Sequence, residues 1–577
     1  MKKKIIIIVI ALLIIMGAIC GYIVYKQKTS NQITTFDTAS LNREDDEIDW
    51  SKYKTTKVTL KDSLSITSGG VYEITGTLKN GNITVSTDDN VKLILNGVSI
   101  TSSDSPAIIV ENAKNVVIEL ADGTTNYLED GSTYSSTYSE IDGVIYSADD
   151  LFLQGSGTLE IKANHGDGIV SKDDLKINNG TYIITSEDDG IRGTDSVYIK
   201  NGNFTITSKG DGIKSTKEED SNKGYVYIEN GTFKITSSLD GISAITKLYI
   251  EDGDFAITTG GGSSNSSTKS TWGMWNSKNT STTASAKGLK SDDTITINNG
   301  TFNLNTSDDA VHSNNYVSIS NATLNITSGD DGIHADSEIV INSGIINISQ
   351  SYEGIEAAVI TINDGDIKVV ASDDGINVAG GADQSSMGRP GANTVNSSSN
   401  NKLTINGGTI YVNSTGDGID VNGSGYVYGG TITVEGPTDN GNAALDYDGE
   451  FVVDGGTVIS VGSSGMLQGI SSNSKQNNII AYLSNVSANT KISIVDSNGN
   501  EVIEFTPSKS YSSLVVSSSK LEMNGTYKIL INGEEYQSFT ISSTTTTIGS
   551  NSNGGMMPGG GMQQGGGMQQ GGGRGRR

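Results

Sequence analysis

Short runs of alternating hydrophobic and polar residues recur at a constant spacing along most of the chain. The triplet Asp-Gly-Ile starts at Asp167, Asp189 and Asp211, with 22 residues from one copy to the next, and later copies keep this period apart from insertions. Asn-Gly or Asp-Gly turns recur at the same period, and alternation such as Phe-Thr-Ile at residues 204–206 follows each turn. Each period therefore predicts about three short strands separated by turns.

A constant period of this length is typical of a solenoid in which each period forms one coil. Three strands per coil, paired in parallel about 4.8 Å apart, predict an all-β, right-handed parallel β-helix over residues 55–470. Stacked coils place equivalent residues above one another, so we expect Phe233 inside, between Phe204 and Phe255. An antiparallel sandwich with Gly-rich turns is the alternative, but it does not explain a constant period.

Both ends of the chain differ from the repeats. Three lysines precede an uncharged apolar run over residues 5–25, which at 1.5 Å per residue is long enough to cross the hydrocarbon core of a membrane. We expect a single-pass membrane anchor, with the rest of the chain outside at the cell surface; a cleaved signal peptide is the alternative. The expected segments are the anchor (1–25), a polar linker (26–54), the β-helix, a C-terminal β-rich capping module (471–548) and a disordered Gly/Met/Gln-rich tail (549–577).

Charge and cysteine content limit the possible partners. The formal net charge of −27 at pH 7 disfavours binding to nucleic acid or anionic lipid. The single cysteine, Cys20, lies in the apolar segment, so neither an internal disulfide nor a zinc site built from Cys and His is expected. A partner should be neutral, cationic, or an anion bridged through a metal ion.

Acidic residues, often paired, mark the turn of each Asp-Gly-Ile repeat. On stacked coils these like charges would lie about 5 Å apart and repel by roughly 1–3 kcal/mol per pair. Calcium suits such a row because it takes 6–8 oxygen ligands in flexible geometry; the alternative is that Asp-Gly is solvated turn chemistry without a metal. The candidate calcium ligands are Asp188, Asp189, Asp308, Asp309, Asp330, Asp331, Glu353, Asp373 and Asp374.

The position after each Ile carries a row of residues that is basic on the earlier coils and acidic on the later ones. If each Ile points inward, this row points outward and could contact a sugar chain; a solvated face is the alternative. Two tryptophans in one Ser/Thr-rich insertion could form a platform for a pyranose ring or could pack the insertion onto the coils, and a second insertion carries an arginine. The candidate carbohydrate-binding residues are Trp272, Trp275, Arg192, Lys214, Lys290, His312, His334 and Arg389.

Three stretches resemble one known family: Ser-Gly-Asp-Asp-Gly-Ile-His-Ala-Asp at 328–336, Ser-Tyr-Glu-Gly-Ile-Glu at 351–356 and Ala-Ser-Asp-Asp-Gly-Ile-Asn at 371–377. They are similar to the bacterial carbohydrate-binding domain family with a polysaccharide-lyase-like right-handed parallel β-helix, over roughly residues 55–470. The resemblance implies bound calcium and the binding of cellulose-like or acidic, pectin-like polysaccharide without demonstrated cleavage.

The sequence thus predicts non-catalytic, calcium-dependent binding of polysaccharide at the cell surface, and no catalytic residue is assigned. Two alternatives stay open, because fold alone does not separate them. One is a calcium-dependent uronate lyase, in which Arg192, Lys214 or Lys290 removes the proton beside a uronate carboxylate. The other is a structural spacer or adhesin that binds protein partners. The family pattern is altered at Lys287 and at Asp309-Ala310, which argues against calcium beside Lys287.

Overall fold

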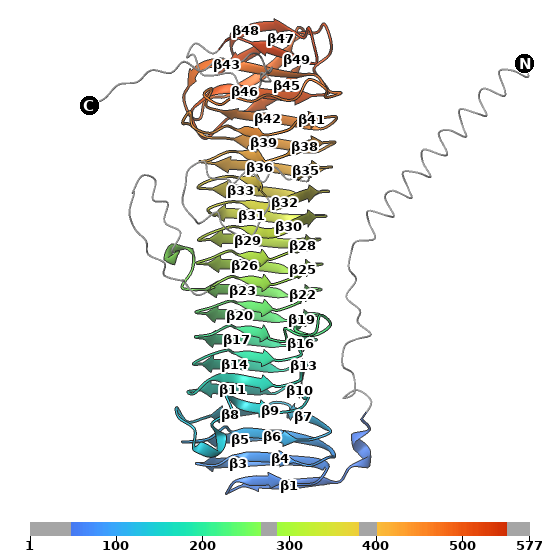
Figure 1. Cartoon of the computed structure of the whole chain (residues 1–577), viewed down its shortest axis with the longest axis vertical. Coiled ribbons are helices and arrows are strands. Elements are labelled where there is room, and N and C mark those ends of the chain that lie inside the picture. Colours follow the sequence, from blue (N-terminus) through green and yellow to red (C-terminus); the bar gives the residue numbers. More distant parts are fainter. Residues whose placement is uncertain (1–47, 267–284, 380–400, 551–577) are drawn as a thin grey trace, which may run out of the picture. The chain divides into compact units, whose positions relative to one another are not determined.

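The computed structural model describes residues 48–266, 285–379 and 401–550 (Figure 1). Contacts group the chain from Trp50 onward into one unit, and that unit is described below. Among the described residues, no helix has the length and apolar character needed to span a membrane. Several predictions fall outside the described residues: the membrane anchor, most of the linker, nearly all of the tail, Trp272, Trp275 and Arg389.

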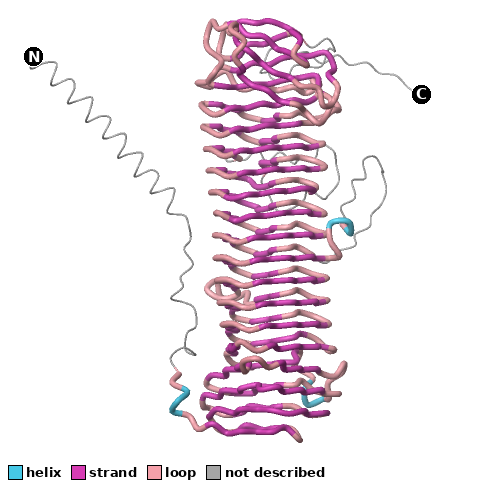
Figure 2. Tube along the Cα trace, turned by 180° about the vertical axis from the view of Figure 1, so that it is seen from behind, coloured by secondary structure: helices cyan, strands magenta, loops and turns pink. Residues whose placement is uncertain are grey.

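Three series of short parallel strands form the coils. In one coil β14 (Thr181–Ser186), β15 (Ile191–Gly193) and β16 (Ser196–Ile199) follow one another, and each pairs with the strand three places later in the chain. We call the sheets built at these three positions sheets 1, 2 and 3. Figure 2 shows the coils as successive layers of strand, with short helical turns only outside the layers. This architecture confirms the predicted parallel β-helix.

The coils repeat these three positions with little change. Sheet 1 continues through β17 (Asn203–Ser208), β20 (Thr232–Ser237), β23 (Asp254–Thr259), β26 (Thr301–Thr306), β29 (Ala322–Ser328), β31 (Gly344–Gln350), β33 (Asp366–Ala371), β36 (Thr409–Ser414), β39 (Thr431–Glu435) and β42 (Thr457–Gly462). Sheet 2 continues through β18 (Ile213–Ser215), β21 (Ile242–Ala244), β24 (Leu289–Ser291), β27 (Val311–Ser313), β34 (Ile376–Val378), β37 (Ile419–Val421) and β40 (Leu445–Tyr447). Sheet 3 continues through β19 (Tyr225–Ile228), β22 (Lys247–Ile250), β25 (Thr294–Ile297), β28 (Tyr316–Ile319), β35 (Lys402–Ile405), β38 (Ser424–Val427) and β41 (Phe451–Val453), while β30 (Ile333–Ile341) and β32 (Ile355–Ile362) each serve both sheets 2 and 3. The coils before β14 begin at β1 (Thr55–Leu60) and are less regular.

A column of stacked aromatic rings fills the interior beside sheet 1. Phe233 is 1% exposed, and its ring centroid lies 4.8 Å from that of Phe204 and 4.7 Å from that of Phe255, as predicted. The ring planes are within 3° and 1° of parallel, so these coils stack with almost no rotation. Gly202 turns the chain below Phe204 with φ of +149°, and a Cβ there would lie 2.7 Å from the Phe204 ring. Straight columns inside require equally straight rows of side chains outside.

The parallel pairing from coil to coil ends at β42, and the strands that follow pair antiparallel except for β43 (Asn478–Val486) with β49 (Thr545–Ile548). The strand β46 (Tyr511–Ser518) pairs antiparallel with β42 and with β43, so the last rung of sheet 1 meets a partner strand from the C-terminal part of the chain. Pairing of this kind covers the open edge that a solenoid otherwise exposes. The remaining strands are β49, beside β43, and a four-stranded antiparallel sheet of β45 (Glu501–Phe505), β44 (Ile492–Asp496), β47 (Thr526–Ile531) and β48 (Glu534–Thr540).

Candidate binding site along an acidic ladder

The turn between sheet 1 and sheet 2 carries an acidic residue on nearly every coil. On one coil Lys287 takes the place of the acid. The ten residues hold equivalent places in the turn, because from Asp189 onward the backbone carbonyl of each accepts the N–H of the residue that follows the ladder position on the preceding coil. We call this row the acidic ladder; its members are Asp167, Asp189, Asp211, Asp240, Lys287, Asp309, Asp331, Glu353, Asp374 and Asp417.

In most ladder carboxylates, one oxygen accepts a hydrogen bond from the backbone of the next coil. Oδ1 of Asp189 accepts the backbone N–H of Asp211 at 2.8 Å, and Oδ1 of Asp309 accepts that of Asp331 at 3.0 Å. Oδ1 of Asp331 in turn accepts the N–H of Glu353 at 3.1 Å. These bonds satisfy buried backbone donors, so an acidic residue here has a structural reason of its own. The other oxygen of each such carboxylate can contact a side chain or an ion beside the ladder.

A second row of side chains stands beside the ladder, one position after the buried Ile, Leu or Val of each sheet 2 strand. Its residues pair in register from coil to coil, so each lies next to the ladder residues of its own and adjacent coils. We call it the partner row; its members are Arg192, Lys214, Ser243, Lys290, His312, His334, Glu356, Asn377, Asp420 and Asp446.

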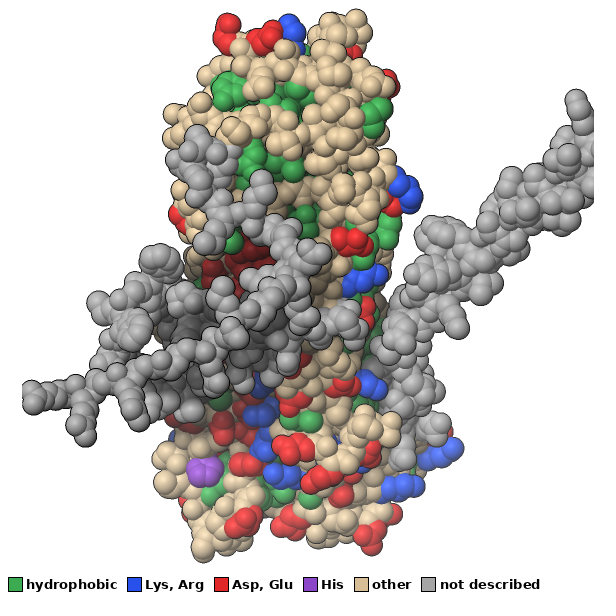
Figure 3. All heavy atoms as spheres, turned by 45° about the horizontal axis from the view of Figure 1, so that its top comes forward, with side chains coloured by type: hydrophobic (Ala, Val, Ile, Leu, Met, Phe, Trp, Pro, Cys, Tyr) green, Lys and Arg blue, Asp and Glu red, His purple; other side chains and the backbone are tan. Residues whose placement is uncertain are grey.

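On the earlier coils the partner row supplies cations to the ladder. The Arg192 guanidinium lies 2.6 Å from Asp167, and Nζ of Lys214 lies 2.8 Å from Asp211. Burial alone would lower the pKa of Arg192 and of Lys214, but the neighbouring carboxylates raise both. Nζ of Lys290 lies 3.2 Å from the ladder carboxylate of the preceding coil. Figure 3 shows Lys and Arg side chains (blue) interspersed with Asp and Glu (red) on the lower coils. These predicted sugar-binding cations thus neutralise the protein's own acids.

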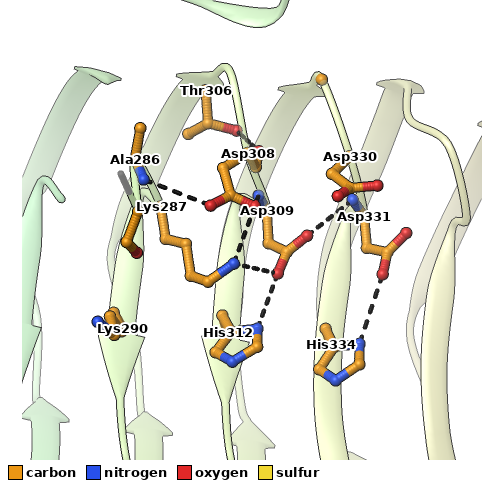
Figure 4. Close-up of polar contacts among 12 residues, drawn as sticks. Ala286, Lys287, Lys290, Thr306, Asp308, Asp309, His312, Asp330, Asp331 and His334 are labelled. Atoms are coloured by element: carbon orange, nitrogen blue, oxygen red, sulfur yellow. Dashed lines mark hydrogen bonds and ion pairs between the residues drawn. The ribbon is translucent and has the colours of Figure 1, made fainter. Parts of the chain in front are cut away.

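An ammonium group stands between two of the predicted calcium ligands (Figure 4). Nζ of Lys287 lies 2.8 Å from Oδ1 of Asp308 and 2.8 Å from Oδ2 of Asp309. Nδ1 of His312 lies 2.7 Å from the same Oδ2. Burial alone would raise the pKa of Asp309, but Lys287 and His312 hold it well below its usual value. The departure from the family pattern at Lys287 therefore supplies a fixed counter-ion. Asp330, whose carboxylate joins the same cluster, closes it on the next coil.

On the coil after that of His312, His334 is surrounded by three carboxylates. Its Nδ1 lies 2.9 Å from Glu356 and 3.4 Å from Asp331, and its Nε2 lies 3.1 Å from Asp336. Burial alone would lower the pKa of His334, but these carboxylates raise it above its ordinary value. Its ring also stacks on His312 with centroids 4.9 Å apart. Both histidines were predicted to contact sugar, and each of their ring nitrogens already contacts a carboxylate or amide oxygen of the protein.

Carboxylates also gather on the later coils. Oxygens of Asp374, Asp417 and Asp420 lie within 4.8 Å of one another, and no ion pair with Lys or Arg joins these three among the described residues. Nδ2 of Asn377 donates to Glu353 at 2.7 Å, on the preceding coil, while its buried Oδ1 has no hydrogen-bond partner. Asp420 is the register partner of Asn377 on the following coil.

Burial, and after it mutual repulsion, raises the pKa of all three carboxylates in this group. Burial, followed by the charges of Asp417 and Asp446, raises the pKa of Asp420 to about 8. Burial also raises the pKa of Asp417 to about 6, against the opposing hydrogen bond from the backbone of Ala443. Asp374 is shifted in the same direction, first by burial and then by Asp417. Three carboxylates that resist ionisation side by side form a place where a cation would be stabilised.

The remaining predicted ligands lie beside these groups. Asp188 is exposed and belongs to a cluster with Asp167 and Asp189, where Arg192 already stands 2.6 Å from Asp167. Asp373 precedes Asp374 in the same turn and is half-buried. Sequence reasoning did not assign Asn377, Asp417 or Asp420 as ligands. The signal was present in Asp417-Gly-Ile-Asp420, where both the ladder and the partner row carry an acid.

Comparison with known proteins identifies similar chains. A family model described as a carbohydrate-binding domain-containing protein matches residues 61–332. A protein of Acetivibrio thermocellus with the same description is 41% identical over 203 residues, which is 34% of this chain and 71% of that relative. A solved structure described as the polysaccharide lyase-like protein from C. thermocellum, gadolinium derivative, shares 36% identity over 35% of this chain and 83% of that chain, with a TM-score of 0.34. The family match ends before Asp374.

Proposed function

Because the chain belongs to the carbohydrate-binding domain family, we propose that it binds an acidic polysaccharide without cleaving it, aided by calcium on the later coils of the ladder. The observation that carries this proposal is the cluster of Asp374, Asp417 and Asp420 beside the unpaired amide oxygen of Asn377. Earlier coils neutralise equivalent carboxylates with Arg192 and similar side chains, whereas among the described residues no Lys or Arg forms an ion pair with Asp374, Asp417 or Asp420.

The donor set on the later coils fits calcium. Asp374, Asp417 and Asp420 would contribute carboxylate oxygens and Asn377 an amide oxygen, and calcium prefers oxygen ligands of these kinds. When bound, the ion supplies positive charge that offsets the carboxylate repulsion and attracts the carboxylate groups of an acidic sugar. Such a bridge matters because the protein itself carries a formal net charge of −27.

The ion pairs on the earlier coils favour binding without cleavage. A uronate lyase needs a base that can accept a proton near neutral pH. Arg192 and Lys214 have raised pKa values because Asp167 and Asp211 hold their protonated forms, despite the opposing effect of burial. These two candidate bases are therefore poorly suited to remove a proton. We also propose that the β-helix lies at the cell surface, which rests on the lysine-flanked apolar run over residues 5–25.

Affinity electrophoresis of the full-length chain tests this function. We expect polygalacturonate in the gel to retard the protein with calcium present and not with EDTA. Asp417→Asn/Asp420→Asn should abolish the retardation. The control Asp366→Asn/Glu501→Gln alters two exposed acids away from the cluster, changes the net charge equally and should behave as wild type.

Three results would contradict the proposal. Equal retardation with calcium and with EDTA would remove the role of the metal. Release of unsaturated sugar, followed by its ultraviolet absorbance, would replace binding with a lyase reaction. Retardation by no polysaccharide at all would favour the structural spacer or adhesin.

A further inference from the structure

A groove crosses the outer face of sheet 1, on a different side of the turn from the partner row. Its volume is about 350 Å³ and it extends over β20, β23, β26, β29 and β31. This volume lies in the range of small-ligand sites in proteins. The side chains that point outward into it include Lys234, Thr236, Ala256, Thr258, Asn303 and Asn305.

These side chains form two straight rows that follow the stack of coils. Lys234, Ala256 and Asn303 pair in register on consecutive coils and form one row, which continues into Asn325. Thr258 belongs to the second row, two residues further along each strand. The phenyl rings of Phe233, Phe255 and Phe302 lie beneath, with successive ring planes within 1° of parallel, and they keep both rows straight. Each coil therefore places one outward side chain in each row at a repeat of about 4.8 Å, and all of those that line the groove except Ala256 are polar.

A short segment forms a rim at the edge of the groove nearest the sheet 1–sheet 2 turn. After β23 the chain enters the 3-10 helix η5 (Ser263–Asn265), and the backbone N–H of Ser263 donates to Oδ1 of Asn305 at 2.9 Å. Ser266 then donates its hydroxyl hydrogen to the carbonyl of Gly329 at 2.7 Å. The segment thus rises along the edge of the coils of β26 and β29 and is bonded to both.

The groove has the chemistry of a neutral, hydroxyl-rich ligand. Lys234 is the one charged side chain among the described residues that line it, and the other polar groups are hydroxyls and amides. Hydroxyls and amides both donate and accept hydrogen bonds, as do sugar hydroxyls. The repeat along the rows is comparable with the length of one pyranose unit of a glycan chain, so successive sugars can meet equivalent groups.

We propose that this groove is a second glycan-binding surface, which takes a neutral polysaccharide along the axis of the coil stack and needs no calcium. The inference goes beyond the function proposed above, because the groove shares no residue with the Asp374–Asp417–Asp420 cluster. The two surfaces would let one chain hold a neutral and an acidic glycan at the same time.

Affinity electrophoresis in EDTA tests the groove separately from the ladder. The probes are three neutral glycans, a soluble β-glucan, a xylan and a galactomannan, and the protein is the full-length chain. We expect at least one probe to retard the wild type, and Thr258→Val/Asn303→Ala to weaken that retention about tenfold through the loss of two or so hydrogen bonds. The matched control is Thr205→Ala/Thr207→Val, which alters the same two rows on β17, outside the groove.

The outcomes separate this proposal from the earlier one. Asp417→Asn/Asp420→Asn should leave neutral-glycan retention unchanged, and Thr258→Val/Asn303→Ala should leave calcium-dependent polygalacturonate retention unchanged. The groove proposal is overturned if none of the three neutral probes retards the wild type. It is also overturned if the groove variant and the β17 control are retarded equally. Because the altered side chains are outward-facing, the melting temperature of both variants should match that of the wild type.

Discussion

Replacing Lys287 by methionine should destabilise the coils around it, because the change keeps most of the side-chain volume and removes the charge. The ammonium group lies 2.8 Å from each of two carboxylates, Asp308 and Asp309. At an effective dielectric of 20, each contact is worth about 6 kcal/mol before the cost of desolvation is counted. Removing one partner of a buried pair typically costs about 3–5 kcal/mol, since the other charge stays buried and unpaired.

Urea denaturation followed by far-ultraviolet circular dichroism measures this loss. We expect Lys287→Met to lower the free energy of unfolding by about 3–5 kcal/mol. Solenoids can unfold locally, so limited proteolysis near residues 285–310 should accompany the melt. The control Lys209→Met removes a pair with Glu187 in which both side chains are largely exposed, and it should cost less than about 1 kcal/mol.

A companion variant separates charge from packing. Lys287→Met/Asp309→Asn should recover part of the loss, because asparagine keeps an oxygen that can accept the backbone N–H of Asp331 and carries no charge. Calcium should also stabilise Lys287→Met more than the wild type, since Asp308, Asp309 and Asp330 then lose their ammonium group. An unfolding midpoint for Lys287→Met equal to those of the wild type and the Lys209 control would refute this electrostatic reasoning.

Three further predictions follow from the fold and the cluster. Phe233→Ala should lower the free energy of unfolding by about 3–5 kcal/mol, and an unchanged urea midpoint would show that the aromatic column does not stabilise the protein at that coil. The pKa values of Asp417 and Asp420 are raised to about 6 and about 8, so in EDTA the folded chain holds more protons than the unfolded chain between about pH 4 and 8, and its stability should fall as the pH rises through that window. Calcium should flatten the profile of melting temperature against pH, and identical profiles with and without calcium would count against the site. Asn377→Leu should weaken calcium binding measured by titration calorimetry and should also lower the urea midpoint in EDTA, because it removes the Nδ2–H donor of the buried Glu353 together with the amide oxygen that has no partner.

The periodic pattern of the sequence was sufficient to predict the coils and the direction of individual side chains. Ile333 is fully buried and His334 stands beside the ladder, as alternation along the strand requires. Phe233 lies in the predicted column. These features depend on the period alone, because stacking places equivalent positions of successive coils in the same environment.

The period could not predict which groups each charged side chain would contact. Arg192 and Lys214 were expected to face a ligand, but they contact Asp167 and Asp211. The contacts of a long flexible side chain depend on distances of a few ångströms, which the spacing of the repeats does not specify. Lys287 stood out as a departure from the repeat, and its position between Asp308 and Asp309 became evident only in three dimensions. The structure was therefore needed to show which carboxylate each of these cations contacts.

The later cluster was missed for a related reason. Asp417 and Asp420 belong to two different rows, and each looked ordinary within its own row. An insertion of 21 residues in the repeat separates them from Asp374 in the sequence, and the strands β34 and β37 on either side of it pair directly. The groove residues Thr258 and Asn303 were recognisable only as outward-facing positions of alternating strands.

Calcium titration of the full-length chain by isothermal calorimetry tests the metal site most directly. After treatment with EDTA and its removal, the wild type and the Asp366→Asn/Glu501→Gln control should each bind at least one calcium ion. Asp417→Asn/Asp420→Asn should bind at least one fewer. Equal stoichiometry in all three proteins, or no calcium binding by the wild type, would contradict calcium at the Asp374–Asp417–Asp420 cluster.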